Sequence, residues 1–389
     1  MKIVIAPDSF KGSLSAQEAA SAMERGVHAA IPDAEIDTIP MADGGEGTLE
    51  ALVSSTNGIF KEAQAVDPLG RPMQTKYGIL GNSKTAVIEM AAVSGLLLLK
   101  KEERNPLDTT TYGTGQLIRH ALESGCTEFI VCIGGSSTND CGAGMAQALG
   151  IHFFRKDKTE ITDKMCGGLL GDVAFIETSG LHPAIQQSRI IAACDVKNPL
   201  LGKRGCAQMY SKQKGATIEI INQLENNMES FIDLAEKITQ KSVRDFPGAG
   251  AAGGLGAGLM LFLGADLQPG ISLVMDVCNF SERMKDADLI LTGEGKIDNQ
   301  TAFGKSIAGI ALCAKSMKIP VIAFGGIVEN AVNLNELGVT AIFPISQPPI
   351  TIEQAMAEAP ALLQNTVERV MWEYKKLELL ILSSTIFNN

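Results

Sequence analysis

The sequence lacks the motifs that mark zinc sites and disulfide frameworks. None of its eight cysteines belongs to a Cys-x-x-Cys pair, and its four histidines do not cluster with them. A structural zinc site and a disulfide scaffold are therefore not expected. The apolar run that ends at Pro7 is too short for a secretory signal. Together these absences predict a cytoplasmic protein with reduced thiols.

An excess of positive charge is also missing. The 389 residues contain 33 Lys and Arg against 44 Asp and Glu, which gives a formal net charge of −11 and a pI near 5.0. Non-specific binding to nucleic acid or to an anionic membrane is therefore disfavoured, and neither partner is expected. An anionic substrate would need local cations to receive it.

Only one long segment lacks charge, and it is rich in glycine. Residues 246–265 carry no charged side chain but contain Pro247 and seven glycines. Because glycine is a poor helix former, this composition favours a buried glycine-rich turn followed by a helix over a transmembrane helix.

The 40 glycines indicate many tight loops, and the length favours two domains. Strand-like runs at 3–5 and 35–39 flank a segment in which Ser15 and Glu18 fit a capping box. Apolar residues then recur at spacings of three and four, as one face of a helix requires. This strand–helix–strand unit predicts two parallel strands.

The same alternation returns near the other end of the chain. Strands are expected at 289–291, 321–324 and 341–343, with helices at 306–315 and 352–375. Alternating strands and helices indicate a parallel sheet that is covered on both faces. We therefore expect residues 1–58 and 285–377 to form one discontinuous, doubly wound α/β domain of the Rossmann or flavodoxin type.

The middle of the chain has a different pattern. Short strands at 60–66, 73–79 and 86–89 are separated by turn residues, which indicates an antiparallel meander. Further helix-like and strand-like segments follow. We expect an inserted mixed α/β domain over 59–284 and assign residues 378–389 to a tail.

Polar loops, 6–13 and 41–48, follow the first two expected strands. In a parallel sheet, loops at the carboxyl ends of the strands line the ligand crevice. Both loops carry carboxylates and glycines, and the first adds Lys11, a combination that suits an anionic or metal-bound substrate. The substrate-binding candidates are Asp8, Ser9, Asp43, Gly44, Gly45 and Glu46.

A glycine-rich segment, 134–144, follows a strand-like run and precedes a helix-like one. Such a loop is typical of a phosphate cradle, although a polar turn is the plain alternative. Segment 248–256 is either a second anion loop or a close-packing turn, and segment 111–115 either holds an anion or begins a helix capped by Thr114. The phosphate-binding candidates are Gly134, Gly135, Ser136, Ser137, Thr138, Asn139, Gly253 and Gly254.

Segment 292–298 ends a strand with two carboxylates that suit Mg²⁺ and one lysine that suits a phosphate. The downstream Gly-Lys-Ser at 304–306 resembles half of a Walker A loop, but Asn299 occupies the place of the required glycine. Lys305 is thus either a phosphate ligand or a surface residue at a helix start.

Asp195 stands near the end of an expected strand, where it could be a base, a metal ligand or a helix cap. Residues 212–216 supply basic side chains nearby in the sequence, with a solvated loop as the alternative. The metal candidates are Asp195, Glu294 and Asp298, and the catalytic candidates are Asp195, Lys11 and Lys296.

Residues 6–15, 40–48 and 134–140 resemble the bacterial glycerate kinase family, in the branch that opens with a Pro-Asp-Ser-Phe-Lys-Gly loop. The resemblance covers Met1 to about Leu377. It departs from the family at Ser137 and Cys141, where members usually carry Ala and Gly; both replacements are small.

The resemblance implies an ATP-dependent phosphotransferase that phosphorylates D-glycerate with Mg²⁺ as cofactor. The family branch suggests the 2-hydroxyl as acceptor, while a 3-phosphoglycerate-forming kinase stays an alternative. A non-catalytic sensor of glycerate or nucleotide is the rival from another class. A nicotinamide-dependent dehydrogenase is disfavoured, because no G-x-G-x-x-G follows the first strand.

Overall fold

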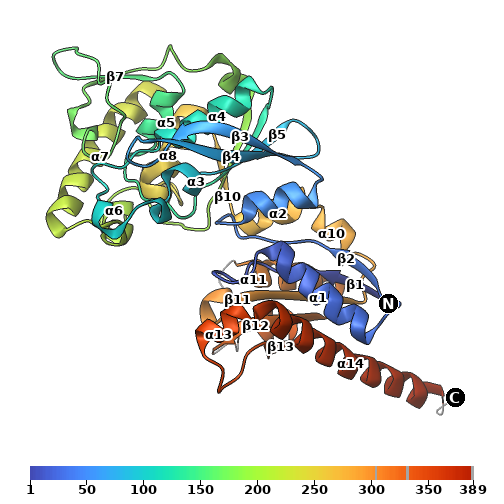
Figure 1. Ribbon diagram of the computed structural model, residues 1–389. Coiled ribbons are helices and arrows are strands. Elements are labelled where there is room, and N and C mark those ends of the chain that lie inside the picture. The colour runs from blue at the N-terminus through green and yellow to red at the C-terminus, as the bar shows by residue number, and fades with distance from the viewer. Residues whose placement is uncertain (303–304, 330–332, 387–389) are drawn as a thin grey trace. The chain divides into compact units, whose positions relative to one another are not determined.

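The structure, a computed structural model, describes residues 1–302, 305–329 and 333–386. The chain forms two compact units (Figure 1). Unit 1 contains residues 1–43 and the chain from Ile271 onward, and unit 2 contains residues 44–270. The discontinuous first domain and the inserted second one are thus present, with boundaries at 43/44 and 270/271 where the sequence analysis placed 58/59 and 284/285.

Unit 1 is built on a parallel sheet of five strands in the order β13-β12-β11-β1-β2. Numbered along the chain, this is the 2-1-3-4-5 order of the flavodoxin-like doubly wound fold, whose switch point lies between its first and third strands. The expected fold class is confirmed. The strands are β1 (Lys2–Ile5), β2 (Glu35–Thr38), β11 (Leu289–Ile297), β12 (Val321–Val328) and β13 (Val339–Pro344).

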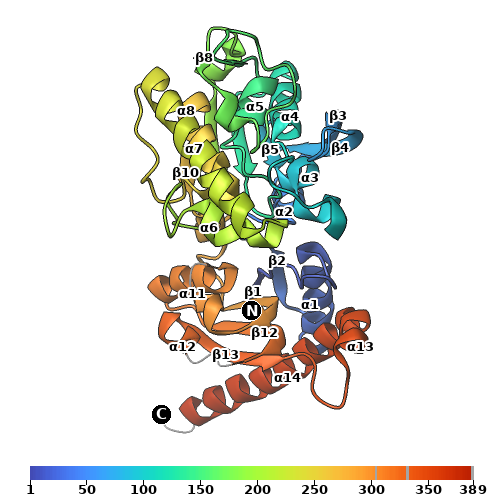
Figure 2. The same ribbon diagram turned by 90° about the vertical axis from the view of Figure 1, so that its left-hand side faces the viewer.

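Helices cover both faces of this sheet (Figure 2). On one face, α1 (Ala16–Ala30) and α14 (Ala359–Ile386) pack together over buried strand residues such as Ile3 and Leu291. On the other face, α11 (Ser306–Met317) and α12 (Leu334–Leu337) share a core with Ala323 and Val339. Unit 1 also contains α10 (Phe280–Arg283), α13 (Ile352–Ala357) and most of α9 (Gly270–Val277).

The capping box that begins α1 is confirmed. Ser15 Oγ accepts a hydrogen bond from the Glu18 backbone N–H at 3.2 Å, and the Glu18 carboxylate accepts one from the Ser15 backbone N–H at 2.9 Å. Both partners lie at the protein surface. Local sequence alone therefore fixes where this helix begins.

Two segments differ from the sequence expectation. Residues 294–297 were expected in a loop, but β11 continues through them because Glu294 pairs with Gly325 and Ile297 with Val328 of β12. A Cβ atom on Gly326 would lie 2.4 Å from Gly295 O, so the glycines permit this close pairing. The expected tail is also helical as far as Ile386, since α14 continues beyond Leu377.

Unit 2 is built on a mixed sheet of six strands in the order β10-β9-β6-β5-β4-β3. Its β3, β4 and β5 form the expected antiparallel meander, and β5, β6, β9 and β10 run parallel. These strands are β3 (Ile59–Val66), β4 (Pro72–Ile79), β5 (Thr85–Glu89), β6 (Glu128–Cys132), β9 (Arg189–Ala193) and β10 (Asp266–Gln268). A separate pair is formed by β7 (His152–Phe154) and β8 (Phe175–Glu177).

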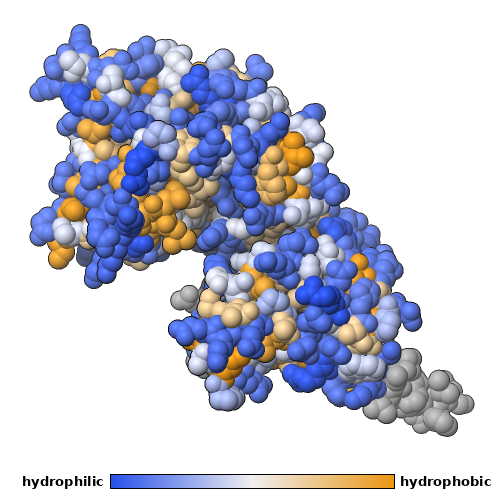
Figure 3. All heavy atoms as spheres, viewed as in Figure 1, coloured by the Kyte–Doolittle hydropathy of each residue, from blue (hydrophilic) through white to orange (hydrophobic). Residues whose placement is uncertain are grey.

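One large apolar core lies in unit 2 between the sheet and its helices. The helices are α2 (Thr48–Ser55), α3 (Ala91–Ser94), α4 (Tyr112–Glu123), α5 (Ala143–Ala148), α6 (Cys206–Tyr210), α7 (Ile218–Thr239) and α8 (Ala251–Leu263). Short 3₁₀ turns occur at Leu96–Leu98, Lys101–Glu103, Leu170–Asp172, Pro183–Gln187, Lys212–Lys214 and Asn299–Ala302, the last of them in unit 1. The visible face of both units is mostly hydrophilic, with small apolar patches (Figure 3).

The glycine-rich segment 246–265 forms a turn followed by the buried helix α8, as expected. Ala252, Gly253 and Gly254 adopt left-handed backbone conformations at the start of α8. A Cβ atom on Gly253 would lie 1.8 Å from Thr138 O, so this turn packs directly against loop 134–140. Over the part of the chain that the structure describes, no helix combines the length and apolar character needed to cross a bilayer.

Candidate active site

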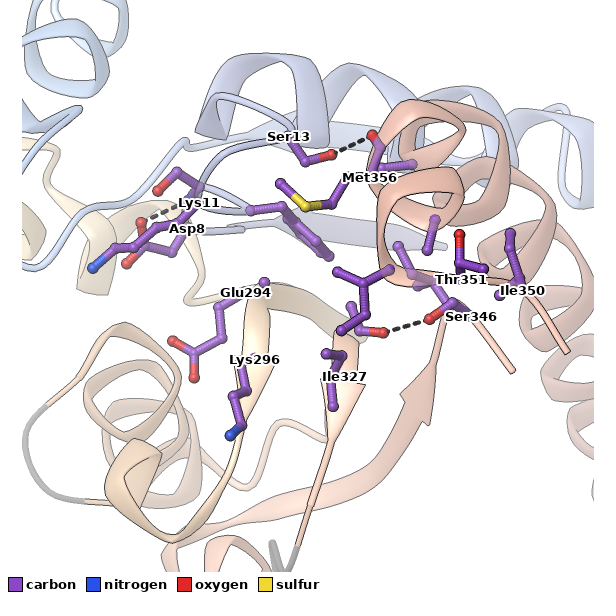
Figure 4. Close-up of a pocket in the computed structure, with 18 of the residues that line it drawn as sticks. Asp8, Lys11, Ser13, Glu294, Lys296, Ile327, Ser346, Ile350, Thr351 and Met356 are labelled. Atoms are coloured by element: carbon purple, nitrogen blue, oxygen red, sulfur yellow. Dashed lines mark hydrogen bonds between the residues drawn. The ribbon is translucent and has the colours of Figure 1, made fainter. Parts of the chain in front are cut away.

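Unit 1 contains a pocket of about 320 Å³ that opens at the carboxyl ends of its strands (Figure 4). Asp8 follows β1 and Glu294 lies on β11, the two strands that meet at the switch point of the sheet. Ligands bind at this place in doubly wound folds. Asp8, Ser9 and Lys11 of the first loop line this pocket, and their role in binding substrate stays a prediction.

Asp8 is buried in the pocket wall, with only 6% of its surface exposed. Ser306 Oγ, at the start of α11, donates a hydrogen bond to Asp8 Oδ2 at 2.5 Å, and the Ser9 backbone N–H donates to Asp8 Oδ1 at 2.6 Å. Burial and the nearby charge of Asp43 nevertheless raise the pKa of Asp8 to about 6. Asp8 therefore changes its charge close to neutral pH.

Glu294 is the second buried carboxyl group of the pocket, with 7% of its surface exposed. It accepts a hydrogen bond of 2.5 Å from Thr301 Oγ1. Burial raises its pKa to about 7, the charges of Asp8 and Asp43 act in the same direction, and Lys305 opposes them. Two carboxyl groups with pKa values near 7 in one cleft are typical of a functional site.

Three lysines line the same pocket. Lys11 is exposed and Lys305 is half-buried at the start of α11. Lys296 is engaged by two carboxylates, Glu329 at 3.0 Å and Asp298 at 3.7 Å. Of the two alternatives for Lys305, the place in the pocket wall agrees with phosphate binding, whereas Lys296 is partly neutralised by its own neighbours.

Asp298 itself does not line the pocket. Its backbone N–H donates to Thr301 Oγ1 at 3.1 Å, so Thr301 links it to Glu294. Neither Thr301 nor Ser306 was selected from the sequence as a site residue. The failed Walker A pattern at 304–306 was the one signal that could have found Ser306; Gly304 of that pattern lies outside the described residues.

The glycine-rich loop 134–140 of unit 2 is held from within by Asp140. This fully buried carboxylate accepts from the backbone N–H groups of Thr111, Gly142 and Gly144, at 2.8, 3.1 and 3.2 Å. It therefore occupies the starts of both α4 and α5. The helix start after the glycine loop, which the sequence suggested as a phosphate cradle, is filled by the protein's own carboxylate.

A buried lysine, Lys214, lies against the same loop. Its Nζ donates to Ser136 Oγ at 2.9 Å and to Thr138 O at 2.6 Å, and burial lowers its pKa to about 8. Thr138 Oγ1 and Asn139 Oδ1 are buried beside it without a hydrogen-bond partner among the described residues. The solvated-loop alternative for residues 212–216 is therefore wrong for Lys214, whose side chain is buried.

Residues 44–48, from the second polar loop that the sequence analysis selected, lead into α2. The first turn of α2 is likewise bound by a carboxylate of the protein itself. Glu89 Oε1 accepts from the Leu49 backbone N–H at 2.9 Å, in the first turn of α2. Glu46 is exposed, and Asp43 before the loop belongs to the pocket of unit 1. Glu89, the last residue of β5, was not selected as a site residue from the sequence.

Asp195 follows β9, as expected, and is exposed. Its Oδ1 accepts a 2.8 Å hydrogen bond from the backbone N–H of Gly270, the first residue of α9. This contact agrees with the helix-cap alternative. The catalytic and metal roles of Asp195 stay predictions.

Within the described ranges, no three His, Cys, Asp or Glu side chains form a group that could hold a metal ion. Within unit 1, a preformed metal centre that contains both Glu294 and Asp298 therefore has no support from the geometry, and the metal role of Asp195 stays a prediction. A Mg²⁺ site that uses one or two carboxylates together with substrate phosphates needs no such group.

Comparison with known proteins shows to which family the chain belongs. The model of the glycerate kinase family matches residues 3–375. The chain belongs to the glycerate kinase family. Glycerate kinase of Bacillus subtilis is 46% identical over 371 residues, which cover 95% of this chain and 97% of that protein.

Two further relatives support the same family assignment. Glycerate 2-kinase of Escherichia coli is 46% identical over 360 residues, covering 92% of this chain and 94% of that protein. A crystal structure assigned to a glycerate kinase 2 of Salmonella typhimurium LT2 has a TM-score of 0.89 at 42% identity, and the match covers 97% of this chain and 99% of that one. The glycerate kinase fold is thus shared over nearly the whole chain, and the family resemblance read from its loops is confirmed.

Proposed function

We propose that the protein transfers the γ-phosphoryl group of ATP to the 2-hydroxyl of D-glycerate, giving 2-phosphoglycerate and ADP. The observation that carries this proposal is the switch-point pocket of a glycerate kinase family member, with buried carboxyl groups at Asp8 and Glu294 and lysines at 11 and 305. Phosphoryl transfer depends on positioning and charge neutralisation, and this group of side chains can supply both. The cytoplasmic location stays a prediction from the sequence.

The carboxylates of the pocket suit Mg²⁺ as cofactor. Asp43 raises the pKa of Asp8, and both raise that of Glu294, so negative charges crowd one end of the pocket. A divalent cation held by oxygen ligands would relieve this repulsion, and Mg²⁺ prefers one or two carboxylates plus phosphate oxygens. When bound, Mg²⁺ would neutralise charge on the phosphates, and Asp8 and Asp43 are the carboxylates that would hold it together with phosphate oxygens.

Lysines would neutralise the remaining negative charge. Lys11 and Lys305 line the pocket, and Lys305 and Ser306 begin α11, whose N-terminus favours anions. We propose that both lysines bind phosphate oxygens. Lys296, already paired with Glu329, would act more weakly.

A carboxylate must also orient the attacking hydroxyl. The sequence suggested Asp195, and the structure adds Glu294, whose pKa of about 7 matches the requirement of a general base at neutral pH. We propose Glu294 as the stronger candidate, because Asp195 is exposed and already accepts the Gly270 N–H.

Loop 134–139 of unit 2 is the proposed second anion site. Lys214 brings a positive charge to it, and the Thr138 hydroxyl is buried beside that charge without a partner among the residues described. A phosphate or a carboxylate could accept from both. Gly253 packs against Thr138 O and Gly254 against Cys141, so both glycines support this loop.

The product isomer tests the proposed reaction. The purified protein is incubated with MgATP and D-glycerate, and ³¹P and ¹H NMR identify the phosphorylated carbon, with L-glycerate and a protein-free sample as controls. We expect 2-phosphoglycerate and ADP in equal amounts from D-glycerate alone. Formation of 3-phosphoglycerate would overturn the assigned acceptor hydroxyl, and binding of both substrates without turnover would overturn the kinase reaction.

A further inference from the structure

The pocket in unit 1 has an apolar end that the reacting groups do not explain. Its lining includes the apolar side chains of Phe10, Ile327, Ile345, Ile350, Ile352 and Met356. Figure 4 shows Asp8, Lys11 and Glu294 at one end and Ile327, Ile350 and Met356 at the other. Ile352 is 64% exposed and Met356 39% exposed, although large apolar side chains are usually covered.

This apolar end is preformed. The Ser13 hydroxyl, in the loop after β1, donates to Met356 O at 2.8 Å and so ties α13 to that loop. Thr351 caps α13 through a capping box with Gln354. Because both ends of α13 are held, the exposed side chains of Ile352 and Met356 keep their place at the pocket mouth.

Glycerate cannot use this surface. Each of its three carbon atoms carries oxygen, so it has no apolar face to bury. A ligand that matches the whole pocket has a flat apolar group at one end and an anionic group, balanced by lysines and a cation, at the other. Ligand pockets generally combine apolar walls with a few polar groups in this way.

We propose that the adenine ring of ATP binds at the apolar end of this pocket, against Ile327, Ile350 and Met356, with its phosphates toward Lys11 and Lys305. The assignment rests on the proposed kinase function for the identity of the nucleotide. It places the base-binding residues on β12, on α13 and in the loop before α13, where the sequence analysis named no site residue. Burial of apolar area against such a surface is favourable and adds to nucleotide affinity.

A matched pair of substitutions on α13 tests the proposal. Ala355 lines the pocket, whereas Ala357 lies on the same short helix, is exposed and does not line it. Ala355→Trp fills the apolar end, and Ala357→Trp makes the same chemical change outside it. Isothermal titration calorimetry then measures the binding of ADP, of adenosine and of D-glycerate to each variant.

We expect Ala355→Trp to weaken ADP and adenosine binding at least tenfold, with the affinity for D-glycerate within about twofold of the parent protein. Ala357→Trp should leave all three unchanged. Unchanged ADP affinity in Ala355→Trp would overturn the proposal, as would a loss confined to D-glycerate. Circular dichroism checks folding; if Ala355→Trp does not fold, Met356→Ala replaces it, with at least threefold weaker adenosine binding expected and no change contradicting the proposal.

Failure of this inference can be told apart from failure of the proposed reaction. Turnover of D-glycerate by Ala355→Trp with an unchanged Kd for ADP would reject the adenine site and keep the kinase. Loss of ADP binding in Ala355→Trp, in a parent protein that does not phosphorylate glycerate, would keep the adenine site and reject the reaction.

Discussion

Single carboxyl groups show most directly how burial prepares this site for chemistry. Asp8 and Glu294 are both buried, with less than a tenth of their surface exposed. Each accepts only one or two hydrogen bonds. Desolvation therefore outweighs those bonds, and the pKa values rise to about 6 and about 7. Each group can thus be ionised or neutral in the pH range where the protein works.

The raised pKa values predict that stability falls as pH rises. Below its ordinary pKa, near 4, each carboxyl is protonated in both the folded and the unfolded state. Between that value and about 7 the unfolded group ionises while the folded group of Glu294 stays neutral, so folding is disfavoured. We expect the parent protein to lose thermal stability from pH 5 to pH 8 relative to Glu294→Gln, by roughly 1.4 kcal/mol for each unit of raised pKa.

Differential scanning calorimetry at the two pH values measures this difference. Glu353→Gln, at an exposed position of α13 outside the pocket, is the control and should follow the parent protein. An equal pH dependence in the parent and in Glu294→Gln would show that Glu294 does not have the raised pKa.

Lys11 is predicted to matter more than an ordinary surface lysine. Lys11→Met should lower kcat/KM more than about 100-fold while the fold persists, because a lysine against phosphate in a partly desolvated cleft contributes about 3 kcal/mol. Lys285→Met, at an exposed position that does not line the pocket, is the control. Steady-state kinetics with a thermal melt decide, and a near-normal rate would make Lys11 a surface residue.

Two carboxylates compete for the role of base, and parallel substitutions separate them. We expect Glu294→Gln to lower kcat about 10²–10⁴-fold, the usual effect of losing a general base. Asp195→Asn should cost about 0.5–2 kcal/mol of stability or less, as the loss of a helix cap does, with turnover at low temperature preserved. The opposite pattern in kcat would return the catalytic role to Asp195.

At this scale the sequence was informative where chemistry and loop position coincide. Asp8, Asp43, Glu294 and Lys11 were selected because they follow strands, and all four line the pocket. Thr301 and Ser306 were not selected as site residues, because their hydroxyl groups reach Glu294 and Asp8 only in the folded structure. The burial of Lys214 was not predicted either, because its neighbours in the sequence are polar and its contact with Thr138 forms only on folding.

Elements were predictable wherever local signals determine them. The capping box fixed the start of α1, and alternating turns and strands fixed the meander of β3, β4 and β5. The extension of β11 through Glu294 was not predictable, because it depends on pairing with glycines about thirty positions later in β12. A strand extension that depends on a partner remote in the sequence cannot be predicted from the local residue pattern.

The turn that opens α8 gives a prediction of its own. Gly253 has φ +68° and its Cβ would lie 1.8 Å from Thr138 O, whereas Gly264 has φ +67° and its Cβ would meet only Lys241 Nζ, at 3.9 Å. Gly264→Ala should cost about 1–2 kcal/mol for the left-handed backbone alone. Gly253→Ala should cost about 1–3 kcal/mol more, because overpacking adds to that strain.

Chemical denaturation of both variants measures the difference, and substrate affinity provides a second readout. Displacement of loop 134–140 should weaken substrate binding in Gly253→Ala only. Equal stability and equal affinity in the two variants would show that the contact between α8 and the loop has no energetic weight.

For the whole molecule, activity should depend on a divalent cation. The crowded carboxylates of the pocket predict that excess EDTA lowers turnover to background and that added Mg²⁺ restores it. A coupled assay for ADP measures this, with EDTA already saturated by Mg²⁺ as the control. Full turnover in EDTA would remove the metal from the proposed function.

The sequence predicted the discontinuous organisation because strand–helix alternation occurs at both ends of the chain and not in the middle. It placed the boundaries about fifteen residues late, at 58/59 and 284/285. Residues 44–58 contain α2, which packs on β4 and β5, and residues 271–284 contain most of α9 and all of α10. The sequence pattern of a helix at a domain boundary does not show which of the two cores the helix packs against.

The strand order of unit 1 also sets the order in which the protein can form during synthesis. β1 emerges from the ribosome before unit 2, yet β11, its neighbour in the centre of the sheet, is translated only after all of unit 2. Unit 2 is contiguous in the sequence, so its core can form before the second part of unit 1, from Ile271 onward, has been made. Translation thus exposes the apolar β1 and the inner face of α1 for most of the time needed to make the chain, and the nascent protein depends on unit 2 folding without them.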